Sequence, residues 1–297
     1  MNSLENKKLK NFLIIANETK DPGLKWTNTV LVKLETRGAK TALLMGKDLD
    51  GLTNNLAGIH CVIVIGGDGT MLRVAQALKG CQVPVIGVNL GVVGFMTEVV
   101  VSEIDNMIDR LLSGDYMIED RMLLSGTVRS YRYNKDNNSE VRSEHTHSVD
   151  ALNDIVLARE NSLRLIAVRI EVNGKYFDTI EADGIIISTP TGSTSYNLSA
   201  GGPIVQPDAR LMVMTPIAPY SMSKRSVVFG ADDKIALELV EKRKNSENIG
   251  LVSFDGANNF HMELGDKVEI SASENIFRLI KFDEASVYEI LKKKIEN

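Results

Sequence analysis

Cysteine and aromatic residues are scarce in this chain, and both shortages limit what it can be. Its 297 residues include 2 cysteines and 1 tryptophan, and aromatic residues make up 5% of the sequence. Two cysteines cannot supply a disulfide framework or a cysteine-based zinc site. We therefore expect Cys61 and Cys81 to be reduced packing residues.

An excess of positive charge and a long apolar run are also missing. The chain has 34 Lys and Arg against 39 Asp and Glu, a net charge of -5. It thus lacks the basic surface that nucleic-acid binding needs. No apolar run approaches the roughly 20 residues that span a bilayer, and the start, Met1 to Lys8, is too polar for a signal peptide. We expect a cytoplasmic protein with no nucleic-acid or membrane partner and with room for two domains.

Three glycines and an aspartate follow a short apolar run in the first third of the chain. The run Cys61 to Ile65 is β-branched and short, whereas Met71 to Leu78 has apolar residues at helical spacing. This pattern predicts a buried strand, a glycine turn and a helix. Glycines let a ligand approach the backbone, and the N–H groups of a helix start favour an anion. The expected phosphate-binding residues are Gly66, Gly67, Gly69 and Thr70.

Asp68, inside the same loop, does not suit a simple phosphate site. A carboxylate repels phosphate oxygens unless it holds a metal or takes the proton of an acceptor hydroxyl. The loop therefore indicates phosphoryl transfer to an alcohol, with Asp68 as general base. The alternative is structural, with Asp68 only capping a helix after a tight turn.

Strands and helices alternate over residues 1–119. Strands are expected at Asn11 to Ala16, Thr41 to Met45, Cys61 to Ile65 and Val83 to Val88, and helices at 24–36, 48–56, 71–78 and 102–113. Such alternation predicts a Rossmann-like parallel sheet with ligands at the carboxyl ends of its strands. If the third and fourth strands pair, Asp68 lies beside the glycine-rich segment Asn89 to Met96. Phe95 in that segment either stacks on a base or fills the core.

Residues 120–280 have the pattern of a mainly β domain. Short strands are expected at 122–129, 155–159, 165–172, 176–180, 185–188, 227–229, 235–240, 251–254, 268–272 and 276–282, with a hairpin turn at Asn173-Gly174. The polar run 132–148 reads as a long solvated loop. Its His145 and His147 have no third ligand nearby and do not predict a metal site. Residues 281–297 are expected to form an amphipathic helix that packs on the first domain.

Two groups of residues in the β domain indicate ligand binding. Asn153-Asp154 precedes an apolar strand, and an amide beside a carboxylate can hold a diol such as two ribose hydroxyls. The alternative is a plain turn. The second group runs from Asp183 to Asn197, where an apolar strand continues into six hydroxyl residues. It favours a polar ligand over a bare Ser/Thr-rich loop.

With these motifs assembled, the chain resembles the NAD kinases over nearly its whole length. The resemblance is carried by Gly66-Gly67-Asp68-Gly69-Thr70, Asn89 to Phe95, Asn153-Asp154, Asp183 to Tyr196, Gly201-Gly202-Pro203 and Thr215 to Arg225. It implies a transferase that phosphorylates the adenosine ribose 2′-hydroxyl of NAD, with ATP or polyphosphate as donor and a divalent metal ion, Mg²⁺ above all. It also implies an α/β domain, a C-terminal β-sandwich, a last helix that returns to the first domain, and a homodimer or homotetramer with a shared site.

Carried over by position, Asp68 resembles the family's proton acceptor. The residues that resemble its NAD site are Asp68, Gly69, Arg73, Phe95, Asn153, Asp154, Arg164, Asp183, Thr194, Ser195, Tyr196, Asn197, Leu198, Ser199 and Ala218. The chain departs from the common pattern at Tyr220, where many relatives have histidine, and at Ala257, where glutamine is common.

Two other functions compete with NAD phosphorylation. A lipid or sphingoid kinase shares the glycine-acid loop but needs an apolar acceptor site, and the hydroxyl-rich segment Thr191 to Tyr196 argues against it. A non-catalytic dinucleotide sensor has no use for Asp68, because a carboxylate weakens phosphate binding.

Overall fold

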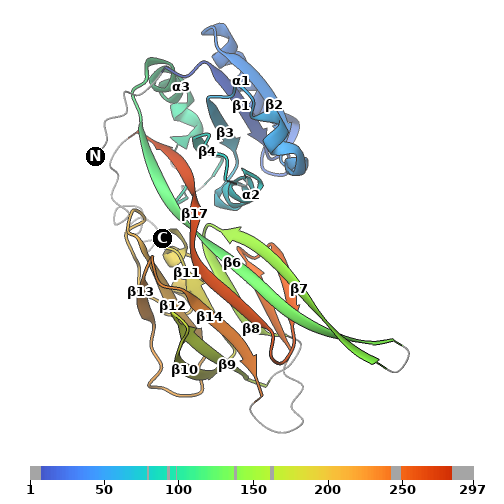
Figure 1. The fold of residues 1–297 in the computed structure, drawn as a ribbon. Coiled ribbons are helices and arrows are strands. Elements are labelled where there is room, and N and C mark those ends of the chain that lie inside the picture. Colours follow the sequence, from blue (N-terminus) through green and yellow to red (C-terminus); the bar gives the residue numbers. More distant parts are fainter. Residues whose placement is uncertain are drawn as a thin grey trace. The chain divides into compact units, whose positions relative to one another are not determined.

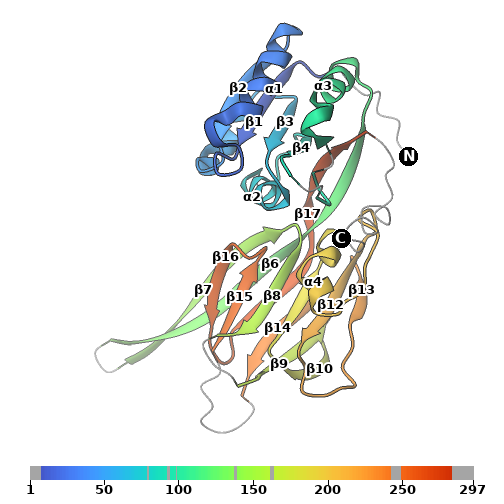
Figure 2. The same cartoon turned by 180° about the vertical axis from the view of Figure 1, so that it is seen from behind.

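The computed structural model describes residues 8–78, 80–91, 94–97, 99–136, 139–160, 164–241 and 249–282. The chain divides into two compact units: unit 1 holds the chain up to Arg121 and again from Asn275, and unit 2 is Met122–Glu274 (Figure 1, Figure 2). The predicted helix over 281–297 lies outside the described residues except for its first two positions. None of the described helices is long and apolar enough to cross a membrane.

Unit 1 is an α/β unit built on a parallel sheet. Its elements are β1 (Asn11–Ala16), η1 (Pro22–Leu24), α1 (Lys25–Thr36), β2 (Lys40–Met45), η2 (Leu49–Asn55), β3 (Cys61–Ile65), α2 (Asp68–Leu78), β4 (Val85–Asn89), β5 (Val99–Val100), η3 (Val101–Glu103) and α3 (Ile104–Ser113). The strands run in the order β2-β1-β3-β4, all parallel, and β5 pairs with β4. The predicted Rossmann-like sheet is confirmed.

Both faces of this sheet are covered. Alternate residues such as Phe12, Ile14 and Ile63 share a buried cluster with Val30 of α1 and Met107 of α3. Helix α2 covers the opposite face, because its Met71 sulfur would lie 3.1 Å from a Cβ added at Gly87 of β4. Burial on both faces explains why β1, β3 and β4 read as continuous apolar runs, whereas no residue of the edge strand β2 is buried.

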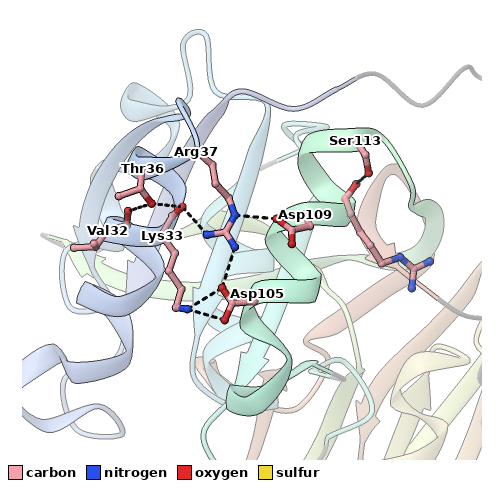
Figure 3. A network of polar contacts seen from close by, with 8 residues as sticks. Val32, Lys33, Thr36, Arg37, Asp105, Asp109 and Ser113 are labelled. Carbon is pink, nitrogen blue, oxygen red and sulfur yellow. Dashed lines mark hydrogen bonds and ion pairs between the residues drawn. The ribbon is translucent and has the colours of Figure 1, made fainter.

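Helices α1 and α3 are also joined at the surface by ion pairs (Figure 3). Lys33 Nζ lies 2.6 Å from Asp105 Oδ2, and Arg37 reaches Asp105 Oδ1 at 3.0 Å and Asp109 Oδ1 at 2.8 Å. The Lys33 ammonium and then the Arg37 guanidinium lower the pKa of the Asp105 carboxyl. Because these groups face solvent, the pairs orient the helices more than they stabilise them.

Unit 2 is mainly antiparallel β structure. Its elements are β6 (Met117–Asp136), β7 (Ser139–Ala151), β8 (Asp154–Arg159), β9 (Ile166–Val172), β10 (Lys175–Ala182), β11 (Gly184–Ser188), η4 (Thr191–Thr194), α4 (Tyr196–Ser199), β12 (Leu211–Ile217), β13 (Val227–Gly230), β14 (Ile235–Val240), β15 (Gly250–Phe254), β16 (Asn258–Met262) and β17 (Lys267–Lys281). The first residues of β6, up to Arg121, and the last residues of β17, from Asn275, belong to unit 1.

Two sheets pack face to face in this unit. One has the order β10-β9-β14-β17, and the other has the order β13-β12-β11-β8-β15-β16. Ile155 and Leu157 of the second sheet share one buried cluster with Val168 and Leu237 of the first. The arrangement is the predicted β-sandwich.

Several local predictions in unit 2 are wrong. The polar run 132–148 is not a loop, because β6 and β7 pair from Leu124↔Ala151 to Asp136↔Ser139. Strands β12 and β16 were not expected, and the two strands expected at 268–272 and 276–282 are the single strand β17. The Asn173-Gly174 hairpin is confirmed, with φ of 52° and 73° at the two turn residues.

Candidate functional site

The glycine loop of unit 1 lies at the carboxyl edge of the parallel sheet, between two asparagines. Strand β3 lies between β1 and β4. Asn17 directly follows β1, and Asn89 is the last residue of β4. Asn17 Nδ2 donates to Thr70 Oγ1 at 2.9 Å, and Asn89 Nδ2 donates to Thr97 Oγ1 at 2.8 Å. Since β3 and β4 pair in register, the two glycine-rich strand exits are neighbours, as predicted.

The four predicted phosphate-binding residues have different surroundings. The N–H groups of Gly66 and Thr70 donate to Val88 O and Gly67 O, at 3.0 and 2.9 Å. These two residues belong to the framework of the loop. By contrast, the N–H groups of Gly67 and Gly69 donate to no acceptor in the described part of the chain. Gly67 directly precedes the 11-residue helix α2, and Gly69 is its second residue. Open N–H groups at the start of a helix attract an anion.

The Asp68 carboxylate holds the neighbouring strand exit by three hydrogen bonds. Its Oδ2 accepts the Phe95 N–H at 2.9 Å, and its Oδ1 accepts the Met96 N–H at 3.2 Å and the Thr97 hydroxyl at 3.1 Å. A Cβ added at Gly94 would overlap Oδ1 and lie 2.6 Å from Oδ2. The helix-cap alternative therefore understates Asp68, because its side chain reaches a segment 27 to 29 residues away.

Phe95 and Arg73 are the other candidates in unit 1. Phe95 is half-buried and is not a member of the buried core, which weakens its structural alternative. Arg73 on α2 donates from Nη2 to the Gly46 carbonyl at 2.6 Å. That bond ties its guanidinium to the end of β2 at the same edge of the sheet.

In unit 2, Asn153 and Asp154 lie where β8 begins. Asn153 Nδ2 donates to Ser195 Oγ at 3.1 Å, whereas the buried Oδ1 has no hydrogen-bond partner within the described residues. Asp154 is 6% exposed. Burial first, and then the negative charge of Asp255, raise the pKa of the Asp154 carboxyl to about 7. An unpaired amide oxygen beside a desolvated carboxyl is more than a plain turn requires.

Three residues of the hydroxyl-rich segment bond to the backbone around them. Ser188, Thr189 and Ser193 are fully buried, and their hydroxyls donate to the carbonyls of Thr189, Leu152 and Pro190. These three hydroxyls therefore bond to the backbone of the fold, and the role of the segment as a polar ligand site stays a prediction. Thr194 and Ser195 are half-buried, and Tyr196, Leu198 and Ser199 are exposed.

Asn197 also serves the fold. Its side chain is fully buried, its Nδ2 donates to the carbonyls of Ser193 at 3.0 Å and Pro203 at 2.9 Å, and its Oδ1 accepts the Thr215 hydroxyl at 2.7 Å. Both hydrogens of the amide group and its oxygen thus bond within the fold. That Asn197 belongs to the NAD site stays a prediction.

Asp183 and Ala218 lie at the opposite end of the same sheet from Asn153. The register pairs Gly184 with Ala158 and Ile217, whereas Ser188 pairs with Asp154. From Asp183 to Ser188 a strand covers about 16 Å at 3.3 Å per residue. Asp183 Oδ1 accepts a hydrogen bond from Arg159 Nε at 2.6 Å, and Ala218 has a left-handed φ of 43°. Arg164 is exposed, shortly before β9.

Sequence reasoning missed Asn17, Thr97, Arg159 and Asp255, which position the predicted residues. Asp255 accepts three consecutive backbone N–H groups, from Leu152, Asn153 and Asp154. Its Asp-Gly pair is a recognisable hairpin turn, with φ of 51° and 70°, but turn chemistry does not reveal what the carboxylate binds. Within the described ranges, no group of three acidic, histidine or cysteine residues is placed to hold a metal ion.

Known proteins resemble the chain over both units. Residues 13–116 match the ATP-NAD kinase N-terminal domain family, and residues 152–282 match the ATP-NAD kinase C-terminal domain family. The NAD kinase of Lachnoclostridium phytofermentans is 37% identical over 290 residues, which cover 96% of this chain and 99% of that one. The NAD kinase of Lachnospira eligens is 36% identical over 307 residues, which cover 97% and 100%.

Solved structures share the fold. A yeast NADH kinase complexed with NADH has a TM-score of 0.81 at 21% identity, covering 98% of this chain and 88% of that one. An NAD kinase from Archaeoglobus fulgidus in complex with ATP has a TM-score of 0.73 at 24% identity, covering 95% and 98%. With two family matches and relatives above 30% identity over nearly the full length, the chain belongs to the NAD kinase family.

Proposed function

We propose that the protein transfers the γ-phosphoryl group of ATP to the adenosine 2′-hydroxyl of NAD, with Asp68 as general base. The observation that carries this proposal is the place of Asp68 at the start of α2, next to the open N–H groups of Gly67 and Gly69. These N–H groups suit phosphate oxygens, and the carboxylate suits the hydroxyl proton. Asp68 takes that proton, the ribose oxygen bonds to the γ-phosphorus, and ADP leaves.

We assign the dinucleotide to residues with open N–H groups, polar side chains or a ring outside the buried core. In unit 1 these are Gly69, Arg73 and Phe95, with the Phe95 ring a stacking surface for a base. In unit 2 the buried Asn153 Oδ1 lacks a donor, and a ribose hydroxyl supplies one. Asp154 beside it accepts or donates according to its protonation.

The divalent ion is proposed to arrive with the phosphoryl donor. The described residues offer no ready cluster of metal ligands, and Mg²⁺ in phosphoryl transfer is commonly held by phosphates with one or two carboxylates. Such an ion neutralises charge on the transferring phosphates when bound. The open N–H groups of the glycine loop act on the same phosphates from the protein side.

We further propose a homodimer or homotetramer in which neighbouring copies share NAD sites. The support is the separation of about 16 Å along β11 between Asp183 and the Asn153 end of the sheet. If each group serves a different NAD molecule, mixing Asp183→Ala with Asn153→Ala protein should give mixed oligomers with one intact site and regain activity that neither variant has alone. Absence of complementation in demonstrably mixed oligomers would contradict shared sites. A cytoplasmic location also stays a prediction.

The activity itself is tested with purified protein, Mg²⁺ and either ATP or polyphosphate. NAD and NADH are each supplied as acceptor, and NADP or NADPH is measured with a dehydrogenase specific for the phosphorylated cofactor. We expect product formation with ATP. ATP turnover stimulated by a sphingoid base and not by NAD would support the lipid-kinase alternative, and NAD binding without turnover would support the sensor.

A further inference from the structure

The loop that carries Asn153 and Asp154 is held by one carboxylate from a distant hairpin. Asp255 Oδ1 accepts the N–H groups of Asn153 at 2.7 Å and Asp154 at 3.1 Å, and Oδ2 accepts that of Leu152 at 2.8 Å. The Asp255 N–H in turn donates to the Asp154 carbonyl at 3.0 Å. Three successive N–H groups that converge on one anion fix the backbone of the loop.

The carbonyl side of the same loop is held as firmly. The Asn153 carbonyl accepts the Thr189 N–H at 2.9 Å, and the Leu152 carbonyl accepts the Thr189 hydroxyl at 2.6 Å. Gly192 packs directly on it, since a Cβ there would lie 2.7 Å from the Asn153 Cα. With its N–H and its carbonyl groups bound, the backbone that carries the Asn153 and Asp154 side chains is held in place.

This arrangement places the half-buried Asp255 carboxylate beside the buried carboxyl group of Asp154. The charge of Asp255 adds to the burial of Asp154, and both disfavour the ionised form of Asp154. An asparagine at position 255 would keep the turn without that repulsion, because it also tolerates a left-handed φ. Position 255 holds aspartate in spite of this repulsion with Asp154, and the nearby Asn153 Oδ1 has no hydrogen-bond partner within the described residues. Together these two features indicate that the loop binds a ligand.

We propose that Asp255 is a positioning residue for NAD: its carboxylate clamps the backbone of residues 152–154 so that Asn153 and Asp154 meet the dinucleotide together. The proposal rests on the proposed function. Asp255 acts through the loop and has no contact with the substrate in this role. Loss of the clamp therefore misplaces two binding groups at once.

The test compares Asp255→Asn with a matched control in the same unit. Like the half-buried Asp255, the buried Asp266 accepts backbone N–H groups with both carboxylate oxygens, from Tyr131 and Glu263, each at 2.9 Å. We expect Asp255→Asn to raise KM for NAD roughly 10- to 100-fold with KM for ATP unchanged, because a misplacement of about 1 Å can cost 10²-fold. Asp266→Asn should lower thermal stability and leave KM for NAD unchanged.

A double-mutant cycle shows whether Asp255 acts through Asn153. If it does, Asp255→Asn combined with Asn153→Ala should bind NAD no more weakly than the weaker single variant, since the clamp has nothing left to position. Should Asp255→Asn not fold, Asp255→Glu, which shifts the carboxylate by one methylene, carries the same expectations. An unchanged KM for NAD, or effects that multiply in the double variant, would overturn the proposal.

The proposed function fails in a different way. If Asn153→Ala and Asp154→Ala leave NAD affinity unchanged by calorimetry, the assignment of the ribose to this loop is wrong. If they weaken NAD binding while folded Asp255 variants do not, the assignment stands and only the positioning role of Asp255 is overturned.

Discussion

Replacing Asp68 by asparagine is expected to lower kcat for NAD phosphorylation by about 10²–10⁴, the usual contribution of a positioned general base. A ribose hydroxyl is a poor nucleophile at neutral pH, and asparagine cannot take its proton. Single-turnover measurement of NADP formation at saturating NAD and ATP isolates this step from substrate binding. A steady-state fall in kcat without a single-turnover effect would contradict a role in proton removal.

The structure adds a second consequence of the same substitution, and it needs a control. An asparagine retains one acceptor oxygen, so the N–H groups of Phe95 and Met96 cannot both keep their present bonds. Thr97→Val removes the third bond to Asp68 and leaves the carboxylate in place. We expect this control to lose at most about tenfold in kcat, the effect of one hydrogen bond. If Asp68→Asn loses no more than Thr97→Val, Asp68 acts only by holding the loop.

Replacing Gly94 by alanine is expected to reduce kcat about 100-fold although no reacting group is changed. The added methyl overlaps Asp68 Oδ1, and the carboxylate is the end of a short side chain held by three hydrogen bonds. It must move and lose some of those bonds, and a misplacement of about 1 Å can cost 10²-fold. Steady-state kinetics with NAD and ATP measures the effect.

Gly91→Ala is the matched control in the same strand exit. A Cβ at Gly91 lies 4.0 Å from Asn89 Oδ1 and meets no closer atom, so this variant should retain near-normal turnover. A Gly94→Ala protein as active as Gly91→Ala would show that the position of the Asp68 carboxylate is not important for the reaction.

The fold of unit 1 was predictable because its inner strands β1, β3 and β4 are buried on both faces. Cys61–Ile65 is fully buried, and its β-branched run needed no knowledge of distant residues. The polar hairpin of β6 and β7 was not predictable in this way. It is held by cross-strand pairing from Leu124↔Ala151 onward, and a pairing partner leaves no hydrophobic period in the sequence.

Strand β12 illustrates a second limit. It contains Pro216, a residue that argues against an interior strand, yet β12 lies between β11 and β13. The ladder tolerates the proline because β13 pairs only with residues 211–214, so the proline nitrogen lies beyond that pairing. Sequence patterns cannot show which residues of a strand have a neighbour on both sides.

The sequence predicted which residues belong to the candidate site better than it predicted what each of them contacts. The strand–turn–helix context placed Asp68 correctly at the sheet edge, but its three hydrogen bonds to residues 95–97 follow only from the pairing of β3 and β4. Asn197 shows the same limit. Its place in a hydroxyl-rich segment does not reveal that its side chain is fully buried and bonds to Ser193, Pro203 and Thr215.

The proposed function requires the adenosine 2′-hydroxyl of NAD to accept the phosphoryl group. An NAD analogue that lacks only this hydroxyl is the most direct test of this requirement. Calorimetry first establishes that the analogue binds, and the phosphorylated product and ADP are then measured with NAD and with the analogue under saturating ATP. We predict NADP and equimolar ADP from NAD, and no phosphorylated product from the analogue. Phosphorylation of the bound analogue, or release of ADP without formation of NADP, would contradict the proposed reaction.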